Sequence, residues 1–90
     1  MFKLAITKNY EKKAKQFFKY NQTLLPQYEK CLELLCLNPK HPSLRLHKLS
    51  GKLAGLFSVS VNISVRVLIY FIIKEDLIVP VDIGSHDKIY

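Results

Sequence analysis

The chain has 90 residues, a length that fits one domain and leaves room for only a modest hydrophobic core. Apolar residues make up 49% and charged residues 23%, with only three Gly and four Pro, which excludes a disordered chain. The longest apolar run, Val67 to Ile73, is far shorter than the roughly 20 residues of a membrane-spanning helix, and the first residues lack the apolar stretch of a signal peptide. We therefore expect one domain, residues 1–90, that folds alone in the cytoplasm without a membrane partner.

Positive charge is concentrated in the first part of the chain. Residues 1–55 hold eleven Lys or Arg and three Asp or Glu, a net charge of +8, whereas residues 56–90 hold three and four, a net charge of −1. Together they give the formal net charge of +7. Such an excess is typical of a protein that binds nucleic acid or an acidic protein.

The first predicted elements are a short strand and two helices. Apolar side chains alternate over residues 2–6, which predicts the strand. Thr7 offers an N-cap for the first helix, whose apolar positions follow helical spacing. These positions are Tyr10, Ala14, Phe17 and Phe18. The second helix tolerates Pro26 in its first turn and ends at Asn38-Pro39, so we expect a helical hairpin.

The two cysteines, Cys31 and Cys36, fall within the second predicted helix. Five residues apart on a helix, they point roughly 140° apart around the axis and cannot easily form a disulfide. We interpret them as reduced thiols that pack in the core, in keeping with a cytoplasmic protein.

The rest of the chain is predicted to be a connector followed by three strands. The connector, Pro39 to Gly55, is basic and has no sustained period. Strands are predicted over residues 57–61, 65–73 and 77–83; the middle one is apolar on both faces, which predicts either a layer on each side or helices on one side and a partner on the other. Pro80 predicts an edge or a bulge in the last strand. The order βααβββ predicts an α+β fold, with the helical hairpin packed on one face of a largely antiparallel four-stranded sheet.

Three side chains suggest chemistry on a phosphate. The strand period places Arg66 on one face together with Tyr70, and a guanidinium fits a phosphodiester and stays charged. The alternative is that Arg66 lies along the surface or pairs with an acid such as Asp82. His47 and His86 each lie near a turn marked by glycine, and two imidazoles can accept and donate protons during phosphodiester cleavage. The alternative for each is a structural histidine.

Three further residues are weaker candidates. Lys48 and Lys52 of the connector can hold an RNA backbone, or they lie on a solvated loop. Tyr90 can stack on a base or assist proton transfer, or it packs on the sheet as a terminal aromatic. The histidines lack the paired spacing of metal ligands, and no CxxC or HExxH motif occurs, so we expect neither a metal nor another cofactor.

Three blocks of sequence resemble the RelE/ParE toxin superfamily of bacterial toxin–antitoxin systems, in particular the YafQ-like mRNA interferases. The blocks are HKLSGKLAGLFSV at residues 47–59, VRVLIY at residues 65–70 and DIGSHDKIY at residues 82–90. The resemblance implies a compact RelE-like toxin that cuts messenger RNA on the ribosome without a metal. It also implies a cognate antitoxin that binds and silences the toxin, with a toxin–antitoxin hetero-oligomer as the possible assembly.

The resemblance also implies roles for individual residues. The positions that match the catalytic residues of the family are His47, Arg66, His86 and Tyr90. This chain has Ser58 and Ser60 where RelE has basic residues, and Asp82 where YafQ has an arginine. These differences leave open an alternative, a ParE-like toxin that inhibits DNA gyrase and is not an enzyme.

Overall fold

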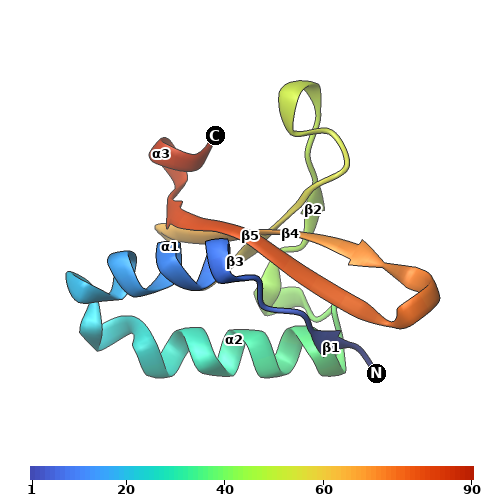
Figure 1. Cartoon of the computed structure of the whole chain (residues 1–90), viewed down its shortest axis with the longest axis horizontal. Coiled ribbons are helices and arrows are strands. Elements are labelled where there is room, and N and C mark those ends of the chain that lie inside the picture. Colours follow the sequence, from blue (N-terminus) through green and yellow to red (C-terminus); the bar gives the residue numbers. More distant parts are fainter.

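Two long helices lie on one side of a five-stranded sheet, and a short third helix follows the last strand (Figure 1). The computed structural model describes residues 1–90. The helices and strands in chain order are β1 (Lys3–Leu4), α1 (Lys8–Lys19), α2 (Leu25–Leu37), β2 (His47–Lys48), β3 (Phe57–Ser60), β4 (Val65–Ile72), β5 (Leu77–Ser85) and α3 (His86–Ile89). Short 3-10 turns are η1 (Gln22–Leu24), η2 (Pro42–Leu44), η3 (Gly51–Leu53) and η4 (Ile73–Glu75).

The sheet has the strand order β1-β5-β4-β3-β2. Neighbouring strands run antiparallel except β1 and β5, which run parallel. The predicted α+β class, helical hairpin and largely antiparallel sheet are confirmed, but the prediction of four strands was wrong. His47–Lys48 of the connector pairs with β3 and adds a fifth strand at the edge. Two residues are too few to show a periodic pattern, which is why the sequence did not reveal this strand.

Both helices begin as their sequences predict. The Thr7 hydroxyl accepts a hydrogen bond from the Tyr10 backbone N–H at 3.1 Å, which caps the first turn of α1. Pro26 lies in the first turn of α2. Backbone N–H groups in this turn have no acceptor within the helix, so the N–H that proline lacks costs the helix no hydrogen bond. Cys31 and Cys36 are both free thiols, as predicted.

The helices bury one face of the sheet. We call the buried cluster on this side the helix-side core. Its members are Tyr10, Tyr28, Cys31, Leu35, Leu44, Val59, Val61, Val65, Val67, Ile69, Ile78 and Ile83. The hydroxyls of Tyr10 and Tyr28 lie 2.7 Å apart in a hydrogen bond that joins α1 to α2. Burial raises the pKa of both tyrosines above its ordinary value, so both hydroxyls stay neutral.

A bulge interrupts the pairing of β4 with β5 beside Pro80. Leu68 of β4 pairs with Asp82, but the next residue of β4 pairs with Pro80, so one residue of β5 is left over. Because β1 pairs only with Leu77 and Ile78, Pro80 lies at this bulge and on a stretch of β5 with no second strand beside it, so the prediction of an edge or a bulge is confirmed. The strand also continues to Ser85, beyond its predicted end at residue 83.

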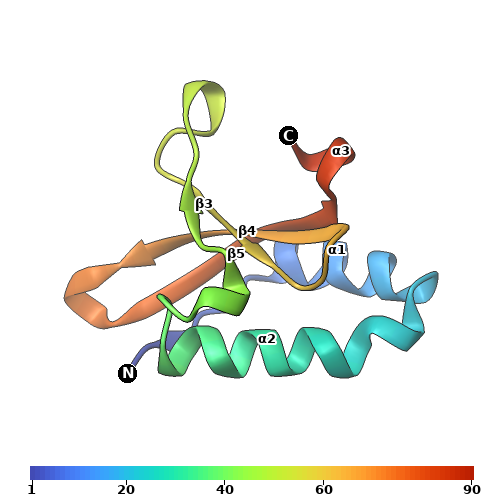
Figure 2. The ribbon, with the colours of Figure 1, turned by 180° about the vertical axis from the view of Figure 1, so that it is seen from behind.

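Two segments project from the opposite side of the sheet, which we call the outer face. They are the segment of β2 and η3, and the short helix α3, and Figures 1 and 2 show both on the side away from α1 and α2. The sequence predicted the first only as a connector, and the second not at all. No helix is both long and apolar enough to cross a membrane.

Candidate active site

The outer face carries the strand residues that alternate with those of the core. Two rows of paired residues cross it: His47, Ser58, Leu68 and Asp82 in one row, and Ser60, Arg66 and Gly84 in the other. Because alternate residues of a strand share a face, His47 and Arg66 lie on the same face, and His86 follows the end of β5 there. Three residues far apart in the sequence are therefore brought to one side of the sheet.

Tyr90 lies beside both histidines. Its ring meets the His86 ring edge-on, with centroids 4.5 Å apart and an interplanar angle of 87°. The centroid of the His47 ring lies 6.4 Å from the same tyrosine ring. The helical turn of α3 accounts for the first contact, since residues four apart are neighbours on a helix. The structure thus gathers three of the four predicted catalytic residues into one cluster, the His47–His86–Tyr90 cluster.

The orientation of His47 is set by its own backbone neighbourhood. Its Nδ1 lies 3.2 Å from the carbonyl oxygen of Arg45. A carbonyl oxygen can only accept, so Nδ1 carries the hydrogen of this bond. In the neutral ring Nε2 then has a free lone pair, as a proton acceptor requires.

His86 is held less firmly. Its Nδ1 lies 3.7 Å from Oδ1 of Asp87, with the two side chains 57% and 100% exposed. An exposed pair of this kind is a weak restraint, because water screens it and both side chains stay mobile. The edge-on contact with Tyr90 is therefore the principal restraint on the His86 ring.

Ser58 holds Tyr90 in place, a role that the sequence did not reveal. The Tyr90 hydroxyl donates a hydrogen bond to Ser58 Oγ. Ser58 is fully buried and lies opposite His47 in the sheet register, so the bond keeps the tyrosine ring beside His47. The one signal for it was the alternation of serine with apolar residues along β3, which marked a polar face.

Arg66 keeps its positive charge without a carboxylate partner. Its Nη1 donates hydrogen bonds to the carbonyl oxygens of Asn62 at 2.7 Å and Ile63 at 3.1 Å, both in the turn between β3 and β4. The alternative in which Arg66 pairs with Asp82 was wrong, because the Asp82 carboxylate accepts instead from the backbone N–H of Ile83 at 2.9 Å. The other guanidinium nitrogens have no hydrogen-bond partner in the chain and can meet an anion.

The two predicted RNA-binding lysines lie on the segment that projects from the sheet. Lys48 is exposed and pairs in register with Phe57, so it points to the other side of β2 from His47. Lys52 is exposed in η3. Neither forms an ion pair, and the two are thus available to bind an anion on this projecting segment.

The cysteine thiols belong to α2, on the opposite side of the sheet from this cluster. Burial raises the pKa of the Cys31 thiol to about 11, so this cysteine is neutral near pH 7. No three His, Cys, Asp or Glu side chains come together as a metal site would need. The outer face offers imidazole, guanidinium and phenol groups, together with the carboxylates of Asp82 and Asp87.

Comparison with known proteins gives matches among solved structures. No protein-family model matches the sequence, and no curated protein matches it. YafQ from E. coli strain BL21(DE3) has a TM-score of 0.80 at 13% identity, over 100% of this chain and 99% of that chain. A metal-bound toxin from Helicobacter pylori has a TM-score of 0.80 at 22% identity, over 100% of both chains.

A toxin in complex with its partner gives a similar result. A chain of the YoeB–YefM complex from Staphylococcus aureus has a TM-score of 0.72 at 16% identity, over 96% of this chain and 98% of that chain. At these identities the shared property is the path of the backbone. It extends over nearly the full length of each chain. The chain therefore has the RelE/ParE toxin fold that the sequence resemblance predicted.

Proposed function

We propose that this chain is the toxin of a type II toxin–antitoxin system and acts as a metal-independent, ribosome-dependent endoribonuclease in the cytoplasm. The observation that carries the proposal is the His47–His86–Tyr90 cluster, on the same face as an arginine with no acid partner. Two imidazoles and a guanidinium are the groups that phosphodiester cleavage needs when no metal assists. The fold, shared with YafQ and with a YoeB–YefM complex, supports the toxin class.

In the proposed reaction the ribose 2′-oxygen attacks the adjacent phosphorus and the bond to the 5′-oxygen breaks. Nε2 of His47 accepts the proton of the 2′-hydroxyl, and protonated His86 donates one to the departing 5′-oxygen. The products are a 2′,3′-cyclic phosphate and a 5′-hydroxyl, so protons and electrons balance without an oxidant. Arg66 stabilises the negative charge that builds up on the phosphate oxygens.

The other residues of this face position the RNA. Because the Tyr90 hydroxyl is bound to Ser58, its ring is the part available to stack on a base. Lys48 and Lys52 attract the RNA backbone by charge alone. The ribosome supplies the messenger RNA in an ordered path, which a small cluster exposed on an open face does not provide by itself.

We expect a cognate antitoxin as the protein partner. YafQ has been solved in complex with DinJ, and YoeB with YefM in a heterotetrameric toxin–antitoxin complex. The formal net charge of +7 favours an acidic antitoxin segment that folds on binding and forms a hetero-oligomer with this chain.

Mapping transcript 5′ ends after brief induction tests the proposal. Cells that express the parent chain should stop growing and accumulate new 5′ ends within translated messages. The His86→Ala and Arg66→Ala variants, expressed at the same level, should leave messages intact. If both variants stop growth and cut ribosome-bound message as well as the parent does, the assignment of these residues is wrong.

A second candidate is a ParE-like inhibitor of DNA gyrase. It is favoured by the outer face itself, where Ser58, Ser60 and Asp82 provide no positive charge. A supercoiling assay separates the two functions. Inhibition of gyrase by the purified chain, without cleavage of messenger RNA on ribosomes, would select this candidate.

A further inference from the structure

The backbone turns sharply just before His47, at a residue with an uncommon conformation. Arg45 has φ 49° and ψ 42°, in the left-handed region that residues other than glycine seldom adopt. In an extended strand a backbone carbonyl points toward the neighbouring strand, whereas side chains point away from the plane of the sheet. The left-handed turn instead brings the Arg45 carbonyl oxygen to 3.2 Å from Nδ1 of His47, two residues further along the chain.

The 3-10 turn η2, Pro42–Leu44, holds Arg45 in this conformation. The Arg45 backbone N–H donates to the carbonyl oxygen of Pro42 at 3.2 Å, and the Leu44 N–H donates to that of His41 at 3.1 Å. The Leu44 side chain is buried in the helix-side core. The turn is therefore anchored in the fold on one side, while the carbonyl group that follows it faces His47.

His41 closes the other end of η2. Its Nδ1 accepts a hydrogen bond from the Ser43 backbone N–H at 3.2 Å, and the Ser43 hydroxyl lies 2.9 Å from the same nitrogen. A backbone N–H can only donate, so Nδ1 of His41 carries no hydrogen. An imidazole here takes the place of the Ser, Thr, Asp or Asn that usually caps a helical turn. The two histidines thus hold opposite tautomers, since Nδ1 of His47 does carry its hydrogen.

The bond to the Arg45 carbonyl is the only hydrogen bond that the His47 ring makes within the chain. Pairing of β2 with β3 fixes the backbone of His47 but leaves its ring free to rotate. The Tyr90 ring, with its centroid 6.4 Å away, does not select a ring nitrogen. Without the carbonyl, the hydrogen of the neutral ring can sit on either nitrogen, and in one tautomer it blocks Nε2.

We infer that His41 is a positioning residue, which caps η2 and so aims the Arg45 carbonyl oxygen to keep Nε2 of His47 free to accept a proton. The inference rests on the proposed function, because a free Nε2 matters only if His47 acts as the base. It assigns the role of Arg45 to its main chain and not to its guanidinium. The base is then prepared by the fold before RNA arrives.

Nitrogen NMR of the histidine rings tests the inference on the full chain without RNA. At about pH 8.5, where imidazole is neutral, the parent should show the hydrogen on Nδ1 of His47 and on Nε2 of His41. His41→Ala should move the His47 hydrogen to Nε2 in about half of the molecules or more. His41→Asn, which restores an acceptor for the Ser43 N–H, should keep the parental tautomer. An unchanged His47 tautomer in folded His41→Ala would overturn the inference.

Two substitutions of Arg45 separate its backbone from its side chain. Both Arg45→Gly and Arg45→Val remove the guanidinium, but glycine adopts a positive φ without strain and β-branched valine does not. With saturating chain on message-loaded ribosomes, Arg45→Gly should cut within about threefold of the parental rate and Arg45→Val at least about tenfold more slowly. An equal loss in both variants would also overturn the inference, because the guanidinium would then be the active part.

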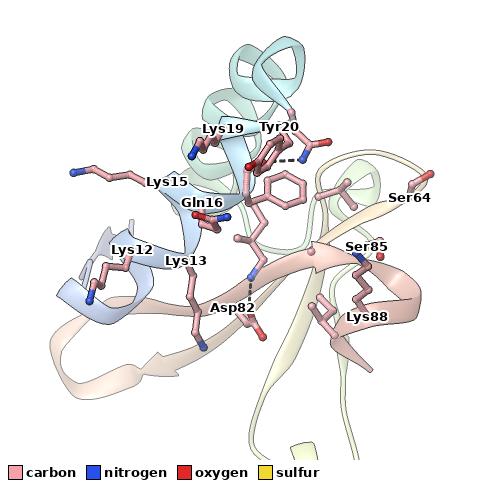
Figure 3. Close-up of a pocket in the computed structure, with 16 residues that line it drawn as sticks. Lys12, Lys13, Lys15, Gln16, Lys19, Tyr20, Ser64, Asp82, Ser85 and Lys88 are labelled. Atoms are coloured by element: carbon pink, nitrogen blue, oxygen red, sulfur yellow. Dashed lines mark hydrogen bonds between the residues drawn. The ribbon is translucent and has the colours of Figure 1, made fainter.

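A lysine-rich groove between α1 and the corner where β5 meets α3 supplies a control on a separate surface (Figure 3). Lys12 lines this groove, whereas His41, Arg45 and His47 do not. Lys12→Ala removes one positive charge, as the Arg45 variants do, and should leave the tautomers of both histidines unchanged. A change of the His47 tautomer in Lys12→Ala would show a response to charge alone and would contradict the role of the turn.

Failure of this inference is distinct from failure of the proposed function. Urea unfolding checks that each variant folds, and His41 is only half-buried. Parental tautomers in every variant of a chain that cuts message would refute only the positioning role. The expected tautomer changes in a chain that cuts no message would refute the proposed function and leave the control of the His47 tautomer by η2 standing.

Discussion

The helix-side core and the outer face draw on the same strands but use their polar groups differently. In the core, the hydroxyls of Tyr10 and Tyr28 are bound to each other and buried. On the outer face, His47 and His86 are exposed, and Arg66 has no acid partner. The sheet therefore separates a side on which paired hydroxyls of the two helices stabilise the fold from one on which imidazole and guanidinium groups remain available for chemistry.

Substitutions on the two sides of the sheet should therefore have different effects, one on stability and the other on activity. A polar group that has a buried partner contributes to stability, and its loss leaves that partner without a hydrogen bond. A polar group that faces solvent contributes little to stability, so its loss should appear in activity. Substitutions on the two faces should therefore change different measurements.

The largest expected effect is on the outer face. Arg66→Ala should slow cleavage of ribosome-bound message by roughly a hundredfold or more, because it removes one electrostatic donor to the phosphate. Lys74→Ala, which removes an exposed charge from the β4–β5 turn, is the matched control and should cut at the parental rate. Circular dichroism and urea unfolding check that the Arg66→Ala variant still folds. Parental cleavage by folded Arg66→Ala would refute its role.

In the helix-side core, alkaline pH should reduce stability. Burial raises the pKa of Cys31 from 9.0 to about 11, so this thiol contributes stability that is fully present below about pH 9 and is lost as the pH rises toward 11. Between pH 8 and pH 10.5 its contribution should fall by about 2 kcal/mol, measured by urea unfolding. Cys31→Ala should lose less stability over the same range. An identical pH dependence in parent and variant would contradict the assignment to Cys31.

Removal of one core hydroxyl should cost stability and leave activity unchanged. Tyr10→Phe leaves the Tyr28 hydroxyl buried without its partner, so the free energy of unfolding should fall by about 1–3 kcal/mol. The double variant Tyr10→Phe, Tyr28→Phe should lose less than the sum of the single variants. Urea unfolding measures both, and cleavage by the folded variants should stay parental. A large loss of cleavage in these variants would break the separation of the two faces.

The smallest effect tests how Tyr90 is held. Ser58→Ala removes the acceptor of the Tyr90 hydroxyl and should reduce cleavage by about tenfold, the equivalent of one hydrogen bond. Ser60→Ala is the matched control, since this buried serine lies on the same face but its hydroxyl has no hydrogen-bond partner. Equal cleavage by the two variants would show that Ser58 does not position Tyr90.

Long periodic elements were predictable from the sequence, and short or non-local ones were not. The apolar stripe of α1, its cap at Thr7 and the bulge at Pro80 all follow from local patterns. The strand His47–Lys48 and the helix His86–Ile89 are too short for a pattern to form. The pairing of β1 with β5 joins the two ends of the chain, which local patterns do not encode.

The candidate site was predictable to a similar extent. Strand alternation was enough to place Arg66 on one face of its strand together with Tyr70. The contact of Tyr90 with Ser58 depends on α3 turning the chain back over the sheet, and the sequence did not show that turn. Without tertiary information, the sequence was also compatible with an ion pair between Arg66 and Asp82. In the structure the Arg66 guanidinium instead donates hydrogen bonds to carbonyl oxygens of the turn that precedes its own strand.

The chemical form of the cut ends tests directly whether this chain cleaves RNA by metal-independent attack of the ribose 2′-oxygen. The purified chain is mixed with ribosomes that carry a defined message. A metal chelator is added at a concentration just below the one that dissociates ribosomes. The RNA fragments are then analysed by mass spectrometry. The fragments should end in a 2′,3′-cyclic phosphate and begin with a 5′-hydroxyl, and the His86→Ala variant should give none. Uncut message, or fragments with a 3′-hydroxyl and a 5′-phosphate, would contradict this mechanism.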